Sequence, residues 1–176
     1  KSWLRSPPKR QTFHVQRKTF HVSRFTFHAP LSHWSPNPEG DLIQNAKQCL
    51  QKNERVLILV PWLTRAKRIH AAIPNARLYT NDLNDGDAFR SWSSFLSGET
   101  RCLVATRLGA WIGSFADIIL LDEPENDDHK QDELAPRYDA RWITHWCCKH
   151  ANADVETIGT TPRLLGHETC SMKHGT

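Results

Sequence analysis

The sequence lacks the features that mark membrane, secreted and zinc proteins. No apolar run in its 176 residues approaches the roughly 20 residues that a membrane helix needs. The N-terminus has no signal-peptide pattern, because its charges and aromatics are interleaved. The five cysteines include no CxxC pair, which argues against structural zinc and a disulfide framework. We therefore expect a cytoplasmic protein without a membrane partner.

Acidic residues are absent from the first 38 positions, which carry seven lysines and arginines. The net charge of +4 is therefore concentrated in residues 1–38, which we interpret as a basic, aromatic, histidine-rich arm. Thr-Phe-His recurs with a spacing of seven, and these residue types favour short extended pieces. Cations among aromatics suit a nucleic-acid strand, since bases stack and phosphates pair with cations. The cations predicted to bind nucleic acid are Arg10, Arg17, Lys18 and Arg24.

The same arm contains His14, His21, His28 and His33, which leave a metal site open as an alternative. Their spacing fits neither one helix face nor a familiar turn of metal ligands. The arm is therefore interpreted mainly as an extended polyanion-binding segment.

The body of the chain, residues 39–166, alternates helical and strand patterns, and residues 167–176 form a tail. Helices are predicted at 41–52 (with Asp41 as N-cap), 63–73, 87–97 and 137–148, and strands at 56–60, 76–79, 101–106, 117–121 and 155–159. Such alternation predicts an α/β fold with a parallel, doubly wound sheet and helices on both faces.

Polar residues follow several predicted strands, at the edge where open α/β sheets bind ligands. They include the pairs Thr106-Arg107, Asp122-Glu123 and Thr160-Thr161. We expect Asp122 and Glu123 at the tip of a central strand, flanked by the strands that carry Thr106 and Thr160. Trp111, Trp142 and Trp146 are interpreted as core or lobe-interface residues rather than base-stacking platforms.

Five short motifs occur in a fixed order between residues 53 and 165. They are Val56–Pro61, Trp92–Arg107, Asp122–Glu125, Lys130–Gln131 with Pro136–Arg141, and Gly159–Pro162. Together they resemble the first motor lobe of superfamily 2 helicases, and within them the primosomal protein N′ family of replication-restart helicases. Asp122–Glu125 is similar to the D-E-x-H box, and Gly159–Pro162 to the G-S-A-T-P motif. The resemblance implies a RecA-like lobe of the P-loop NTPase type.

By this resemblance, Asp122 would hold Mg²⁺ through water, and Glu123 would orient or deprotonate the attacking water. Thr160 and Thr161 would couple the nucleotide state to lobe movement. The cofactor implied is Mg-ATP if the lobe is active, and none otherwise.

The resemblance also places Thr106 and Arg107 along a nucleic-acid path, where hydroxyl and guanidinium groups contact phosphates. Lys130, Arg137 and Arg141, in the loop from 126 to 141, would contact DNA. The implied partner is single-stranded or forked DNA, together with a protein that supplies a second lobe.

The chain departs from the family where the phosphate loop should lie. Residues 34–41 read WSPNPEGD, with one glycine, no lysine and two prolines that lack amide donors. Glu39 and Asp41 would repel a triphosphate. The second lobe and the zinc cysteines of the family are also absent from this sequence. We therefore predict a divergent or truncated lobe that binds DNA in replication restart with weak or absent ATPase activity.

Two alternatives remain. One is a non-enzymatic nucleic-acid-binding or assembly protein that uses the α/β body as a scaffold and the arm as the binder. The other is a small-molecule enzyme on an unrelated α/β fold. No nucleophile–base arrangement in the sequence supports that second alternative.

Overall fold

The computed structural model describes residues 31–133 and 135–160, with side chains described from Ser35 onward. Within this part, six strands form one parallel sheet in the order β1-β8-β5-β2-β4-β3. The strands are β1 (Leu31–Trp34), β2 (Val56–Leu59), β3 (Arg77–Tyr79), β4 (Cys102–Ala105), β5 (Ile118–Asp122) and β8 (Asp154–Gly159). The predicted α/β class with a parallel sheet is therefore confirmed.

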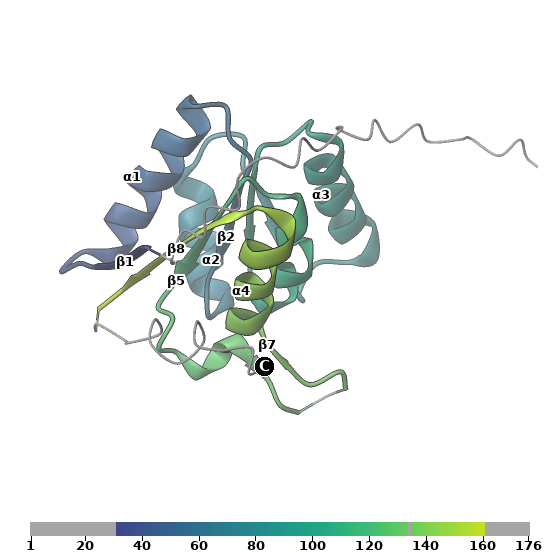
Figure 1. Ribbon diagram of the computed structural model, residues 1–176. Coiled ribbons are helices and arrows are strands. Elements are labelled where there is room, and N and C mark those ends of the chain that lie inside the picture. The colour runs from purple at the N-terminus through teal and green to yellow at the C-terminus, as the bar shows by residue number, and fades with distance from the viewer. Residues whose placement is uncertain (1–30, 134, 161–176) are drawn as a thin grey trace, which may run out of the picture.

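Helices cover both faces of this sheet (Figure 1). They are α1 (Pro38–Gln51), α2 (Leu63–Ala72), α3 (Asp85–Ser97) and α4 (Ala140–Ala151), with short 3₁₀ helices η1 (Arg107–Phe115) and η2 (Asp127–His129). One core cluster joins α1 and α2 to the sheet, and a second joins α3, η1 and α4 to it. Within the described residues, no helix is both long enough and apolar enough to cross a bilayer.

All four residues of β2 and all four of β4 are buried, as expected for strands covered on both faces. Cys102 lies among them and is a small core residue. Burial raises the pKa of its thiol to about 12, which leaves it protonated and unreactive.

The strand order corrects one expectation about the site. β5, which ends in Asp122, lies between β8 and β2. Thr106 follows β4, which pairs with β2 and lies one strand farther from β5. Thr160 does follow the neighbouring strand β8. The second neighbour of Asp122 and Glu123 is therefore the end of β2, which is followed by Pro61 and Trp62.

Several element boundaries differ from the prediction. Helix α1 begins at Pro38 rather than Asp41, because Asn37 caps it by accepting from the Gly40 amide and a proline suits the first helical turn. Helix α4 begins at Ala140 rather than Arg137, because Asp139 caps it. Residues 138–139 instead form β7 (Tyr138–Asp139), which pairs antiparallel with β6 (Lys130–Gln131).

The sequence predicts residues 31–34 as part of the arm, but in the structure they form edge strand β1, which pairs in parallel with β8. This strand begins at Leu31, directly after Pro30 in the sequence. Residues 1–30 of the arm lie outside the described residues, as do Thr161 and the 167–176 tail.

The aromatic residues of α3 differ in burial. Phe95 is buried, whereas Phe89 and Trp92 are exposed. Trp111, Trp142 and Trp146 are 54%, 61% and 56% exposed, so the part of the prediction that placed them in the core is wrong.

Candidate functional site

Asp122 occupies the end of β5 and is completely buried. Its two carboxylate oxygens both accept hydrogen bonds from Arg65, which lies in the first turn of α2. The Nη2–Oδ1 distance is 2.9 Å, and Nε donates to Oδ2. Arg65 is itself only 7% exposed, so the pair is a buried, bidentate ion pair.

Two further carboxylates surround the same guanidinium. Arg65 Nη1 lies 3.5 Å from Glu39 Oε2 and 3.4 Å from Glu123 Oε1. Glu39, in the first turn of α1, also pairs with Arg68 at 2.5 Å. We call the group Glu39, Arg65, Asp122 and Glu123 the acidic corner. It joins the starts of α1 and α2 to the end of β5.

The charges in this corner are strongly coupled. Burial raises the pKa of Asp122 to about 6, although pairing with Arg65 opposes that shift. Burial also opposes the charge on Arg65, but the hydrogen bonds and charge of Asp122 outweigh it and raise the pKa of the guanidinium. Both groups are therefore ionised at neutral pH, and each neutralises the other.

The turn between β1 and α1 stands where the family resemblance would place a phosphate loop. Its polar groups are used internally: the Asn37 amide donates to Ser35 Oγ at 2.9 Å, and the Gly40 amide donates to Asn37 Oδ1 at 3.2 Å. A Cβ on Gly40 would lie 2.2 Å from Asn37 Nδ2, so the side chain of Asn37 fills the space above this glycine. With Glu39 beside it, this turn does not fit a triphosphate.

Magnesium fits the corner no better. Both oxygens of Asp122 are bound by Arg65, and no water-accessible surface of that carboxylate remains. Within residues 35–133 and 135–160, no group of three His, Cys, Asp or Glu side chains is arranged to hold a metal ion.

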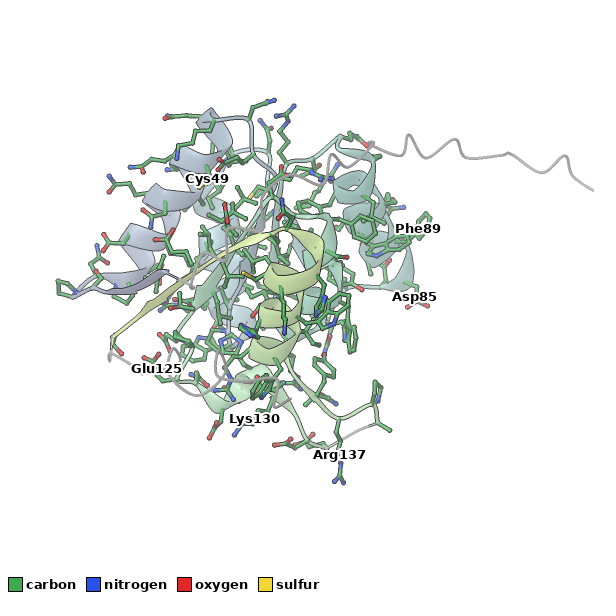
Figure 2. The ribbon with its side chains drawn as sticks, viewed as in Figure 1. Cys49, Asp85, Phe89, Glu125, Lys130 and Arg137 are labelled. Atoms are coloured by element: carbon green, nitrogen blue, oxygen red, sulfur yellow. The ribbon has the colours of Figure 1, made fainter. Side chains whose placement is uncertain are left out.

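Glu125 connects the loop after β5 to the end of β8. Its Oε1 accepts from the Thr160 amide at 3.3 Å and from the Thr160 hydroxyl at 3.1 Å. The contact requires glycine at position 159, because a Cβ there would lie 2.7 Å from Glu125 Oε2. The structure thus brings the predicted coupling residue Thr160 against the residue that stands in place of the histidine of D-E-x-H. In Figure 2, Glu125 lies near the tip of β8.

Arg141 lies on the inside of the loop where a DNA contact was predicted. Its side chain is only 9% exposed and donates to the Asp139 carboxylate and, at 2.9 Å, to the carbonyl of Pro124. A weaker contact reaches the carbonyl of Asn126 at 3.5 Å. In this structure Arg141 holds the loop after β5 against the start of α4.

The other residues of this loop point in different directions. Lys130 is paired with Asp127 at 2.8 Å, whereas Arg137 is exposed and points away from the body of the protein (Figure 2). His129 is completely buried, with Nε2 at 2.8 Å from the Asp122 carbonyl. Burial lowers the pKa of His129.

A separate pocket of about 440 Å³ lies at the carboxyl ends of β2, β3 and β4. It is lined by Pro61, Trp62, Leu63, Thr80, Asn81, Asp82, Thr106, Arg107 and Asp128. We call it the strand-end pocket. Arg107 is held in it by Gln131 Oε1 at 2.8 Å and by the Asp128 carbonyl at 3.2 Å. Thr106 and Arg107 therefore both line this pocket, at the end of β4, and β2 separates that strand from β5 and the acidic corner.

Sequence reasoning missed Arg65 as a member of the site. The sequence does place Arg65 at the start of a predicted helix, four residues beyond Pro61, but its pairing with Asp122 depends on the order of the strands. The remaining predicted nucleic-acid contacts, Arg10, Arg17, Lys18 and Arg24, lie outside the described residues, as does Thr161.

Comparison with solved structures shows the class of fold. The chain resembles the C-terminal domain of Dbp5 (L327V) from S. cerevisiae bound to Gle1 H337R and IP6, with a TM-score of 0.55, 14% identity and coverage of 76% of each chain. It also resembles the DUF1998 helicase MrfA bound to DNA and AMPPNP, with a TM-score of 0.52, 9% identity and coverage of 72% of this chain and 18% of that one. These likenesses show a RecA-like helicase-lobe fold.

A curated relative gives a more particular likeness. The sequence is 28% identical over 130 residues to the replication restart protein PriA of Synechocystis, covering 70% of this chain. The chain spans about 15% of the length of that relative. No family model matches the sequence.

Proposed function

We propose that this chain is a divergent helicase-like lobe that binds DNA in replication restart and does not hydrolyse ATP by itself. The observation that carries the proposal is the buried Arg65–Asp122 pair. Asp122 stands where the family resemblance implies a magnesium ligand, and a protein cation already binds both of its oxygens. Opening that corner would leave a buried charge without a partner, which is strongly unfavourable.

DNA binding is supported by the strand-end pocket and by the likeness to PriA. Thr106 supplies a hydroxyl group, Arg107 a guanidinium and Trp62 an indole, which together suit contacts to phosphates and bases. The similar structure of MrfA is described as bound to DNA.

A nucleotide titration tests the first half of the proposal. With a fluorescent ATP analogue and Mg²⁺, we expect no saturable binding up to about 1 mM, which corresponds to only about 4 kcal/mol of binding free energy. DNA-stimulated hydrolysis that disappears in Glu123→Gln would contradict the proposal. Glu123 is suited to this control because it is partly exposed and its substitution leaves the Arg65–Asp122 pair in place.

Titration of a labelled single-stranded oligonucleotide tests the second half. Arg107→Ala should weaken binding about threefold to tenfold and lower the salt dependence by about one phosphate contact, a change of about 0.7 in slope. Arg107→Lys should recover most of the affinity. The matched control is Arg77→Ala, which removes an exposed cation from the amino end of β3, whereas the pocket lies at the carboxyl ends of the strands. Equal losses for Arg107→Ala and Arg77→Ala would contradict a binding path through the strand-end pocket.

The alternative of a non-enzymatic assembly protein is favoured by the composition of the arm. Residues 1–38 contain seven lysines and arginines and no aspartate or glutamate, a composition that suits binding of a polyanion without help from the body. A chain whose DNA affinity is lost with the arm but unchanged in Arg107→Ala would fit this alternative.

A further inference from the structure

The exposed large apolar side chains gather on one side of the sheet. Within the described residues they are Phe89, Trp92, Leu108, Trp111, Phe115, Trp142 and Trp146. All of them belong to α3, η1 or α4, which share one core cluster, whereas α1 and α2 on the other side carry none. Single exposed aromatics are ordinary, but a patch of this kind on one face marks a binding surface.

The centre of this surface is a groove between η1 and α4. It has a volume of about 480 Å³ and is lined by Trp111, Ser114, Trp142, Ile143, Trp146 and Cys147. Trp142 and Trp146 lie one helical turn apart on α4, and Trp111 faces them from η1. We call this the tryptophan groove. Its three indoles are each more than half exposed, so they are free to contact an apolar partner.

The two elements that form the groove carry charge of one sign. Residues 107–115 and 140–151 contain no aspartate or glutamate. The second of these segments ends in Lys149 and His150, both exposed, with His145 one turn earlier. A segment that fills the groove would therefore gain from carboxylates at its flanks.

We propose that the tryptophan groove docks an acidic amphipathic segment of a partner protein. The apolar side chains of that segment would enter between Trp111 and the two indoles of α4, and its carboxylates would lie beside Lys149. Aromatic side chains in a groove of this kind are the usual anchors of such interfaces. This surface is distinct from the strand-end pocket, and the inference is independent of DNA binding.

Charge and ring geometry argue against the other occupants. A second copy of this groove would place Lys149 against cations of the same kind. A nucleic-acid strand needs free ring faces and cations within the groove, but no lysine or arginine lines it. One face of Trp146 is also covered by the ring of His150, with centroids 5.0 Å apart and an interplanar angle of 34°.

A peptide selection tests the proposal without assuming a sequence. The full chain would be immobilised and a phage library of random 16-residue peptides selected on it, with the Trp142→Ser/Trp146→Ser variant for counter-selection. We expect enriched peptides with apolar residues spaced by three and four positions and an excess of Asp and Glu. Synthetic copies should bind at least tenfold more tightly to the native chain than to the variant, as measured by fluorescence anisotropy.

The matched control is Phe89→Ser/Trp92→Ser, which removes an exposed aromatic pair from α3 on the same side but outside the groove. It should leave peptide affinity within about twofold, and thermal melts of both variants should show the native transition. The proposal is overturned by an absence of enrichment, by enriched peptides that are basic, or by equal losses in the two variants. It is also overturned if the Trp142/Trp146 variant abolishes oligonucleotide binding or dissociates a dimer instead.

Discussion

At the scale of single residues, Arg65 decides how the acidic corner behaves. An arginine that is buried among three carboxylates cannot be moved without exposing their mutual repulsion. The corner therefore holds the starts of α1 and α2 against the end of β5. Its chemistry is that of a closed ion-pair network rather than an open metal site.

We expect Arg65→Met to destabilise the protein by about 3–5 kcal/mol, because it leaves the Asp122 carboxylate buried without a partner. The double variant Arg65→Met/Asp122→Leu should recover most of that loss, since two apolar groups can replace a buried pair at little net cost. Urea unfolding curves would measure both. A single variant that loses less than about 1 kcal/mol, the usual range for an exposed pair, would show that the corner is open to solvent.

His129 gives the fold a pH dependence of known sign. Burial lowers its pKa below the value in the unfolded chain, and the nearby charge of Arg141 acts in the same direction, while Asp139 opposes it. The folded state therefore binds fewer protons than the unfolded state below the unfolded pKa near 6.5. Stability contributed by neutral His129 is present above that pH and is lost as the pH falls.

The comparison of the native chain with His129→Phe isolates this effect. Between pH 7.5 and 5, the native chain should lose more stability than the variant, with a difference slope of at most about 1.4 kcal/mol per pH unit. Asp122 has a raised pKa and so acts in the opposite direction, but it is common to both proteins and cancels. Identical pH profiles in chemical denaturation would contradict this, because they would show that His129 has the same pKa in the folded and unfolded states.

At the scale of elements, apolar periodicity predicted most of the structure. The runs Val56–Val60 and Ile118–Leu121 have the unbroken apolar character of strands buried on both faces, and both are central strands of the sheet. The four helices were also found, because each has one apolar face and polar ends. The predicted first residues of the helices were less accurate. Helix α1, for example, begins three residues earlier than predicted, because Asn37 caps it and Pro38 occupies its first turn.

Elements that depend on contacts between distant parts of the chain were not predictable from the sequence. Helix η1 reads RLGAWIGSF, and its tight packing depends on two glycines: a Cβ on Gly109 would lie 2.3 Å from the Ala105 Cβ, and one on Gly113 2.9 Å from Ile119 Cδ1. Strand β1 is short and follows a segment rich in β-favouring residues. The sequence pattern alone therefore could not distinguish this strand, which pairs with β8, from the rest of the arm. The partner of Asp122 was likewise hidden, because an ion pair between residues 65 and 122 depends on the sheet order.

At the scale of the whole molecule, charge is divided between the arm and the body. All 19 acidic residues follow position 38, so the net charge of +4 arises from the arm. The body presents the strand-end pocket at the carboxyl edge of the sheet and the tryptophan groove on one face. We therefore expect a polyanion to be attracted mainly by residues 1–38, with a sequence-independent affinity that depends strongly on salt.

Removal of residues 1–30 tests this division while sparing strand β1, which begins at Leu31. We expect the truncated chain to keep its thermal transition but to lose at least tenfold in affinity for single-stranded DNA at moderate salt. The matched control keeps the arm and replaces Arg10, Arg17, Lys18 and Arg24 with glutamine. Loss of four phosphate contacts should flatten the plot of log affinity against log salt by about 3 units of slope. If the truncated chain and the native chain have the same salt slope, the cations of the arm do not contact the nucleic acid, and the body alone must bind it.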